Sequence, residues 1–211
     1  MSPDVSRESI LKNVSRESLE KLEHYLALLE KWQKAVNLVS PTTIRDAWNR
    51  HFIDSAQLSS LLPTGAKTLF DFGSGAGFPG MVLAMLNPGL SVHLVESDQK
   101  KCSFLAAVSR ETMTTVSIHN IRIESLQIDV VPDVISARAL ADLNQLLEYS
   151  MPWARKNPDL VLLLPKGENY TSELKEIGSG RFAQCEEFRS CTSENARILR
   201  ISGLKTDVHK E

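Results

Sequence analysis

The stretch "DFGSGAGFPG", residues 71–80, follows the apolar run "KTLF" and holds four glycines in its last eight positions. A glycine-rich turn between a strand and a helix lets the backbone approach a ligand closely, and it presents free N–H groups at the start of the helix. Residues 75–80 match the G-x-G-x-x-G pattern of dinucleotide-binding proteins, a weak signal when taken alone. The stretch therefore predicts a cofactor-binding loop and leaves the cofactor to be decided by its neighbours.

Two acidic residues bear on that choice. Asp71 stands directly before glycines that alternate along 73–77, a D-x-G-x-G-x-G pattern like that of S-adenosylmethionine (SAM) enzymes. A carboxylate there suits a ligand with an ammonium and a sulfonium and would repel a pyrophosphate. Glu96 ends the next expected strand, where it can accept hydrogen bonds from both ribose hydroxyls of either cofactor. We therefore expect SAM, with an NAD-dependent oxidoreductase as the alternative.

The sequence around this loop alternates between strands and helices, which predicts a parallel sheet covered on both faces. The tail differs, because 181–190 and 196–202 read as two neighbouring strands and predict an antiparallel hairpin at the sheet edge. The fold class is therefore α/β, Rossmann-like, with a mostly parallel seven-stranded sheet. The other strands are expected at 68–72, 90–96, 116–121, 133–138 and 160–165, and the helices at 80–86, 98–112, 141–151 and 168–177.

The N-terminal part is predicted to be helical. From Glu17 apolar residues recur at spacings of three and four as far as Val36, and a second helix is expected from Pro41 to about Leu62. We divide the chain into an N-terminal helical extension, 1–62, and a Rossmann-like cofactor-binding domain, 63–211, packed as one unit. Trp32 and Trp48 fall at helical spacing and are interpreted as core residues.

The composition narrows the function classes. The chain has 211 residues, 42% of them apolar, and a net charge of −2, which argues against a strongly basic nucleic-acid binder. Its three cysteines are widely spread and form no zinc spacing, so we expect reduced thiols and no metal. No apolar run approaches the roughly 18 residues of a membrane span. We expect a cytoplasmic protein with no membrane partner.

Five short motifs carry a resemblance to a known family. In their order and spacing the chain resembles the bacterial small-subunit ribosomal RNA guanine-N7 methyltransferases, known as RsmG or GidB. The resemblance covers about residues 20–170, and it implies a class I methyltransferase fold, SAM as methyl donor and guanine N7 as acceptor. The motifs are "RHFIDS" (50–55), "DFGSGAGFPG" (71–80), "IRIES" (121–125), "SARALADL" (136–143) and "LLPKG" (163–167).

The resemblance, together with the loop and strand-end acid, supplies a set of candidate site residues. Ile123 and Glu124 are expected to flank the adenine, and Arg138 to reach the methionine end or the target base. Two departures from the family stand out: the strand reads "ISARA", one residue longer than "SRA", and Pro165 precedes Lys166. The expected cofactor-binding residues are Asp71, Gly73, Gly75, Phe78, Glu96, Ile123, Glu124 and Arg138.

Guanine N7 has an in-plane lone pair at neutral pH, so methyl transfer to it needs alignment and exclusion of water and no general base. Arg138 and Lys166 are candidates for holding guanine O6, because both side-chain types pair well with that edge. Lys100 and Lys101 occupy the first turn of a helix, where the macrodipole disfavours cations by ~0.3–1 kcal/mol each. The RNA-binding candidates are Arg50, His51, Lys100, Lys101 and Lys166.

Other acceptors stay open at this stage. A SAM enzyme of this size can act on another RNA or on a small molecule, and a ribosome-binding module without catalysis is a further possibility. The resemblance implies small-subunit ribosomal RNA as the partner, and the weakly negative net charge leads us to expect this RNA in an assembled particle, bound by a monomer. His51 and Asp54 lie three residues apart, and the family motif suggests that both border the mouth of the pocket.

Overall fold

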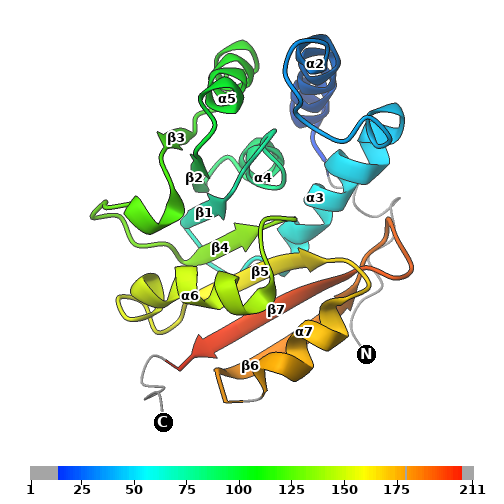
Figure 1. Ribbon diagram of the computed structural model, residues 1–211. Coiled ribbons are helices and arrows are strands. Elements are labelled where there is room, and N and C mark those ends of the chain that lie inside the picture. The colour runs from blue at the N-terminus through cyan, green and yellow to red at the C-terminus, as the bar shows by residue number, and fades with distance from the viewer. Residues whose placement is uncertain (1–13, 179, 206–211) are drawn as a thin grey trace.

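The computed structural model describes residues 14–178 and 180–205. Residues 1–13 and 206–211, which belong to the two predicted parts of the chain, lie outside this description. No helix within the described ranges has both the length and the apolar character needed to cross a membrane. Figure 1 shows one central sheet with helices on both of its faces.

The sheet has seven strands in the order β3-β2-β1-β4-β5-β7-β6. The first five of these are parallel, while β7 runs antiparallel to both β5 and β6. This arrangement confirms the predicted parallel sheet with an antiparallel hairpin at one edge. The strands are β1 (Thr68–Phe72), β2 (Ser91–Glu96), β3 (Ser117–Asn120), β4 (Val134–Ala137), β5 (Val161–Lys166), β6 (Phe182–Arg189) and β7 (Arg197–Leu204).

Side chains that alternate along each strand fill two separate cores, as the two-residue period of a strand requires. Leu69 of β1 points to the core under the first helical layer, and Phe70 and Phe72 point to the other core. Figure 1 shows the two layers that cover these faces. One layer holds α2 (Arg16–Gln33), α4 (Gly80–Leu86) and α5 (Gln99–Glu111), and the other holds α6 (Leu143–Ala154) and α7 (Tyr170–Ile177).

The segment predicted as a helix over 41–62 is helical over 44–61, but it is not one regular α-helix. It consists of short pieces whose hydrogen-bond period changes along the chain. Stretches of π-helix are rare and occur frequently at functional sites. Apolar spacing does not reveal them, because the inward residues keep nearly the same intervals. The pieces are the 3₁₀-helix η1 (Ile44–Asp46), the π-helix η2 (Trp48–Ile53), the α-helix α3 (Asp54–Ala56) and the 3₁₀-helix η3 (Gln57–Leu61).

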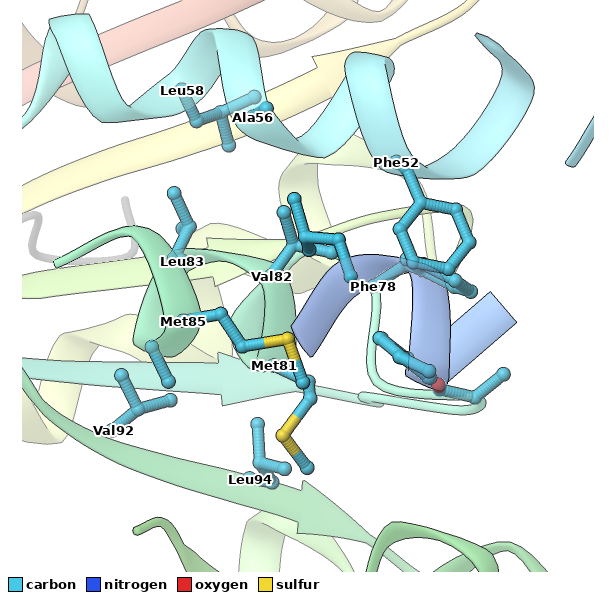
Figure 2. Packing of buried hydrophobic residues seen from close by; sticks show 14 of the residues in the cluster. Phe52, Ala56, Leu58, Phe78, Met81, Val82, Leu83, Met85, Val92 and Leu94 are labelled. Atoms are coloured by element: carbon cyan, nitrogen blue, oxygen red, sulfur yellow. The ribbon is translucent and has the colours of Figure 1, made fainter. Parts of the chain in front are cut away.

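This segment still packs on the core beneath the first helical layer. Figure 2 shows Phe52, Ala56 and Leu58 facing Phe78 and α4. Phe52 and Phe78 meet edge to face with ring centroids 5.2 Å apart. The apolar face of the segment therefore points at the cofactor loop and α4, which leaves its polar residues free to border a site.

The N-terminal helix α2 also packs against the loop. Its N-cap is Ser15, whose side chain accepts from the Ser18 N–H. Tyr25 is fully buried, stacks on Phe78 and donates its hydroxyl hydrogen to the carbonyl of Ala76 in the glycine loop. The predicted N-terminal extension thus supplies part of the support for the loop at 73–80.

Trp32 and Trp48 pack at the edge of this core, in line with their interpretation as packing residues. Trp32 lies 5.6 Å from Phe104 and Trp48 stacks 5.3 Å from Phe52, measured between ring centroids. Both rings are partly exposed.

Candidate active site

The glycine loop lies at the carboxyl end of β1 and takes a backbone path that favours glycine. Gly73, Gly75 and Gly77 have φ angles of 63°, 56° and 94°, in the left-handed region that costs other residues about 1–2 kcal/mol. A Cβ on Gly77 would come within 2.6 Å of the Tyr25 hydroxyl oxygen. The glycines therefore serve both the turn geometry and the close approach of α2.

Asp71 lies beneath this loop and does not line the cavity beside it, contrary to our expectation that its carboxylate faces the ligand. Its Oδ2 accepts from the Gly80 N–H at 3.1 Å, and its Oδ1 accepts from the Ser136 hydroxyl at 2.7 Å. Burial raises the pKa of Asp71 to about 6, even though these bonds favour the ionised form. The carboxylate fastens the end of the loop to β1 and β4.

Glu96, at the end of β2, holds the other side of the loop. Its Oε2 accepts from the Gly75 N–H at 2.9 Å and its Oε1 from the Asp98 N–H at 2.8 Å. An ionised carboxylate has about four acceptor positions, so these two bonds leave acceptor capacity on a residue that lines the cavity. Glu96 therefore lines the cavity, and its contact with a ribose stays a prediction.

A first cavity of about 540 Å³ opens over the loop and the ends of β1 and β2. It brings together Gly73, Gly75, Phe78, Glu96, Ile123, Glu124 and Arg138, which are the predicted cofactor residues apart from Asp71. Ile123 and Glu124 belong to the short 3₁₀-helix η4 (Ile123–Ser125), and Glu124 accepts from the Tyr149 hydroxyl at 2.9 Å.

A second cavity of about 460 Å³ adjoins the first. Its walls come from the η2–α3 segment, the ends of β4 and β5, and the loop between β6 and β7. Thr43, His51, Arg138 and Ala139 line both cavities, so Arg138 stands at their junction.

The guanidinium of Arg138 is held on several sides. Its Nη1 donates to the carbonyl of Arg50 at 3.1 Å and lies 3.5 Å from Asp54 Oδ2. Its Nη2 lies 3.0 Å from His51 Nδ1, and its central carbon stands 5.2 Å from the Phe78 ring centroid, within the range of a cation–π contact. A guanidinium has five N–H donors, and these three polar partners leave two of them.

His51 contributes to this arrangement as a neutral ring. Burial, followed by the charges of Arg138 and Arg50, lowers the pKa of His51 to about 4. Because Nδ1 faces an obligate donor on Arg138, the proton must reside on Nε2, which lies 3.0 Å from Thr43 Oγ1. The predicted RNA-binding residue His51 therefore acts as an acceptor toward Arg138.

The predicted cations occupy different positions around the two cavities. Arg50 is exposed and lines the second cavity, and Lys101 lines the first. Lys100 is exposed at the start of α5 and lines neither cavity. Lys166 lines the second cavity, and its ammonium donates to the Ala141 carbonyl at 3.0 Å and pairs with Glu173 at 2.7 Å.

Several lining residues were not predicted. Ser190 and Thr192, from the loop between β6 and β7, reach the second cavity across a large sequence separation, which no local pattern records. Ala139 has a φ of 51°, unusual for a residue other than glycine, and such backbone strain is concentrated at functional sites. Leu140 overlies the loop, because a Cβ on Gly73 would fall 2.6 Å from its Cδ1.

The sheet order, the glycine loop and the acid at the end of β2 define a class I methyltransferase fold. Solved structures show the same fold at low sequence identity. A ribosomal protein L11 methylase from Lactobacillus delbrueckii subsp. bulgaricus aligns with a TM-score of 0.57 at 16% identity, covering 72% of this chain and 77% of that one. The O-methyltransferase TomG from Streptomyces achromogenes aligns with a TM-score of 0.56 at 14% identity, covering 87% and 89%.

Sequence comparison is more specific. The family model GidB, described as rRNA small subunit methyltransferase G, matches residues 18–197. Proteins named ribosomal RNA small subunit methyltransferase G are 48% identical in Rhodospirillum rubrum and 43% identical in Rhizobium meliloti, each covering 90% of this chain and 93% and 92% of their own lengths. The chain belongs to this methyltransferase family, which confirms the predicted resemblance and removes the oxidoreductase alternative.

Proposed function

We propose that this protein transfers a methyl group from SAM to N7 of a guanine in small-subunit ribosomal RNA. Membership of the rRNA small subunit methyltransferase G family supports the reaction class and the RNA substrate. The observation that carries the site assignment is the junction of two cavities at Arg138, which matches one space for a methyl donor and one for an acceptor base.

The residues of the first cavity fit SAM. A volume of about 540 Å³ lies within the 300–1,000 Å³ typical of small-molecule sites. Glu96 keeps acceptor capacity for ribose hydroxyls, and Ile121 and Ile123 supply apolar surface for a purine ring. When bound, SAM supplies a methyl group activated by a positive sulfonium. Glu96, the glycine loop and η4 would hold the bound SAM.

The second cavity suits the acceptor base. Guanine presents O6 and N7 as acceptors along one edge, and Arg138 keeps two N–H donors after its contacts with Arg50, His51 and Asp54. Donation to O6 holds the base while N7 stays free to react. His51, neutral at physiological pH because of its low pKa, adds no positive charge to this space. Alignment and exclusion of water then lower the barrier.

Arg50 and Lys101, which line the second and first cavities, and the exposed Lys100 would contact RNA phosphates. With a net charge of −2, the whole chain offers little general attraction for RNA. This supports an assembled ribosomal particle as substrate, in which RNA and protein surfaces share the docking of a cytoplasmic monomer.

The test is methyl transfer from labelled SAM to naked small-subunit RNA, 30S particles and 70S particles, with nucleosides identified by mass spectrometry. We expect 7-methylguanosine and faster transfer to a particle than to naked RNA.

The variant Arg138→Lys tests the site. It keeps the charge but loses the planar donor fork, so its kcat falls about 100-fold or more. Arg155→Lys, at an exposed position after α6, serves as the matched control. In the substrate test, labelled methyl in another nucleoside would contradict guanine N7 as the acceptor. Equal rates on all three substrates would contradict the assembled particle as the preferred substrate.

A further inference from the structure

The carboxylate of Asp54 contacts two parts of the second cavity at once. Its Oδ2 lies 3.5 Å from Arg138 Nη1, on the side of β4. Its Oδ1 accepts from the Thr192 hydroxyl at 2.7 Å and lies 3.4 Å from the Ser190 hydroxyl, on the side of the β6–β7 loop. The side chains of Asp54 and Arg138 are only 16% and 19% exposed, so these contacts are largely shielded from solvent.

Gln57, one turn beyond Asp54, completes the attachment of the loop. It is buried, its Nε2 donates to Asp54 Oδ1 at 3.0 Å and to the Ser190 hydroxyl at 3.2 Å, and its Oε1 accepts from the Cys191 N–H at 3.0 Å. The loop backbone is therefore fixed to the same short segment that holds Arg138.

We propose that Asp54 is a positioning residue for methyl transfer: one carboxylate sets the Arg138 guanidinium and fastens the loop over 190–196 as the opposite wall of the acceptor cavity. The inference rests on the proposed function, because it assigns the second cavity to the acceptor. Asp54 itself does not touch the reacting atoms in this arrangement. Its effect on the reaction passes through Arg138 and through the shape of the cavity.

The geometry makes Asp54→Asn a sharp perturbation. The amide oxygen can still accept from Thr192, but the amide nitrogen then faces the Arg138 guanidinium, and two donors oppose each other. Arg138 loses an anionic partner and shifts within the cavity. A displacement of about 1 Å at a reacting site costs about 100-fold in rate, so we expect kcat to fall 10- to 100-fold while the dissociation constant for SAM stays within about threefold.

A double-mutant cycle separates positioning from a merely structural role. Single-turnover methyl transfer is measured for the wild type, Asp54→Asn, Arg138→Lys and the double variant. If Asp54 acts through Arg138, the double variant is about as slow as Arg138→Lys alone, because coupled residues are not additive. If the rate losses of the two single variants multiply in the double variant, Asp54 does not act through Arg138, and this part of the proposal is overturned. Asp54→Glu, which keeps the charge, is expected to recover part of the rate.

The loop gives a second readout that needs no methyl acceptor. Hydrogen exchange of a peptide covering 190–196 is compared between the wild type, Asp54→Ala and the control Asp159→Ala, which changes an exposed residue in the turn between α6 and β5. We expect at least tenfold faster exchange in Asp54→Ala alone, because alanine removes the oxygen that accepts from Thr192 and Gln57. Unchanged exchange overturns the fastening of the loop by Asp54. Failure of the wild type to methylate guanine N7 would count against the proposed function. The hydrogen-exchange measurement would still test whether Asp54 fastens the loop.

Discussion

At the scale of single residues, Asp71 departs most from the sequence-based expectation. A strand-end acid before a glycine loop was interpreted as a direct partner of a cationic ligand. Its carboxylate instead bonds to Gly80 and Ser136 below the loop and is fully buried. The sequence identified this residue but not its buried position, because burial and partners depend on how β4 lies against β1.

This geometry predicts the behaviour of Asp71→Asn. An asparagine can donate to the Ser136 oxygen and accept from the Gly80 N–H, so both partners remain satisfied. If the carboxylate acts as a support, the SAM dissociation constant changes by less than about threefold in a calorimetric titration. A rise of tenfold or more would show that its charge attracts the cofactor directly.

The same variant has a signature in pH. The pKa of Asp71 is about 6 in the folded protein and near 3.8 in the unfolded chain, so between these values the folded state binds more protons. The contribution of Asp71 to stability therefore falls as pH rises from about 4 to 6. Relative to Asp71→Asn, the wild type should lose at most about 1.4 kcal/mol per pH unit in urea unfolding over that window. Asp129→Asn, an exposed position, should show no such difference.

At the scale of elements, the start of α4 is where strand, loop and helix meet. A Cβ on Gly80 would fall 2.5 Å from Leu94 Cδ2, 2.7 Å from Asp71 Cβ and 2.8 Å from its Oδ2. The helix can therefore approach β1 and β2 only if this position is glycine. The glycine of the "PG" motif at 79–80 is therefore needed for the packing of α4 against β1 and β2, as well as for the loop.

We expect Gly80→Ala to destabilise the protein by about 1–3 kcal/mol through overpacking, measured as a lower urea midpoint at unchanged slope. Gly89→Ala is the matched control, because a Cβ there meets nothing within 4 Å. Its free energy of unfolding should stay within about 0.5 kcal/mol of the wild type. Equal midpoints for both variants would contradict the close approach of α4.

The same scale shows what local patterns could and could not predict. Helix α4 was predicted with its observed limits, 80–86, and the hairpin of β6 and β7 lies at an edge of the sheet, as predicted. The change from 3₁₀- to π- to α-helix over 44–61 was missed, since the apolar spacing of Phe52, Ala56 and Leu58 suits an ordinary helix. The loop over 190–196 was missed as part of the site, because its contacts with Asp54 bridge more than 130 residues.

At the scale of the whole molecule, the N-terminal helices and the Rossmann-like part share one core. Tyr25 of α2 contacts Phe52, Phe78 and Phe104, which come from three other elements or loops, and its hydroxyl reaches the glycine loop. Ser18 donates to the carbonyl of Met85 at 2.9 Å. The boundary near residue 62 therefore marks a change in sequence pattern. It does not mark a break in packing, because side chains from both parts of the chain share one core.

The prediction that the chain is one cooperative unit can be tested with its own tryptophans. Trp48 lies in the N-terminal part, and Trp153 lies in α6 against Phe70. Two variants, each with one of these tryptophans and phenylalanine at the other two positions, report on the two parts separately. Because a shared core links them, fluorescence and far-ultraviolet circular dichroism should give coincident urea transitions within each variant. An N-terminal transition that precedes loss of the sheet signal would show two units.

Tyr25→Phe should lower the free energy of unfolding reported by both tryptophans by about 1 kcal/mol, because it leaves the Ala76 carbonyl without its buried donor. A decrease reported by Trp48 alone would mean that α2 stabilises only the N-terminal part.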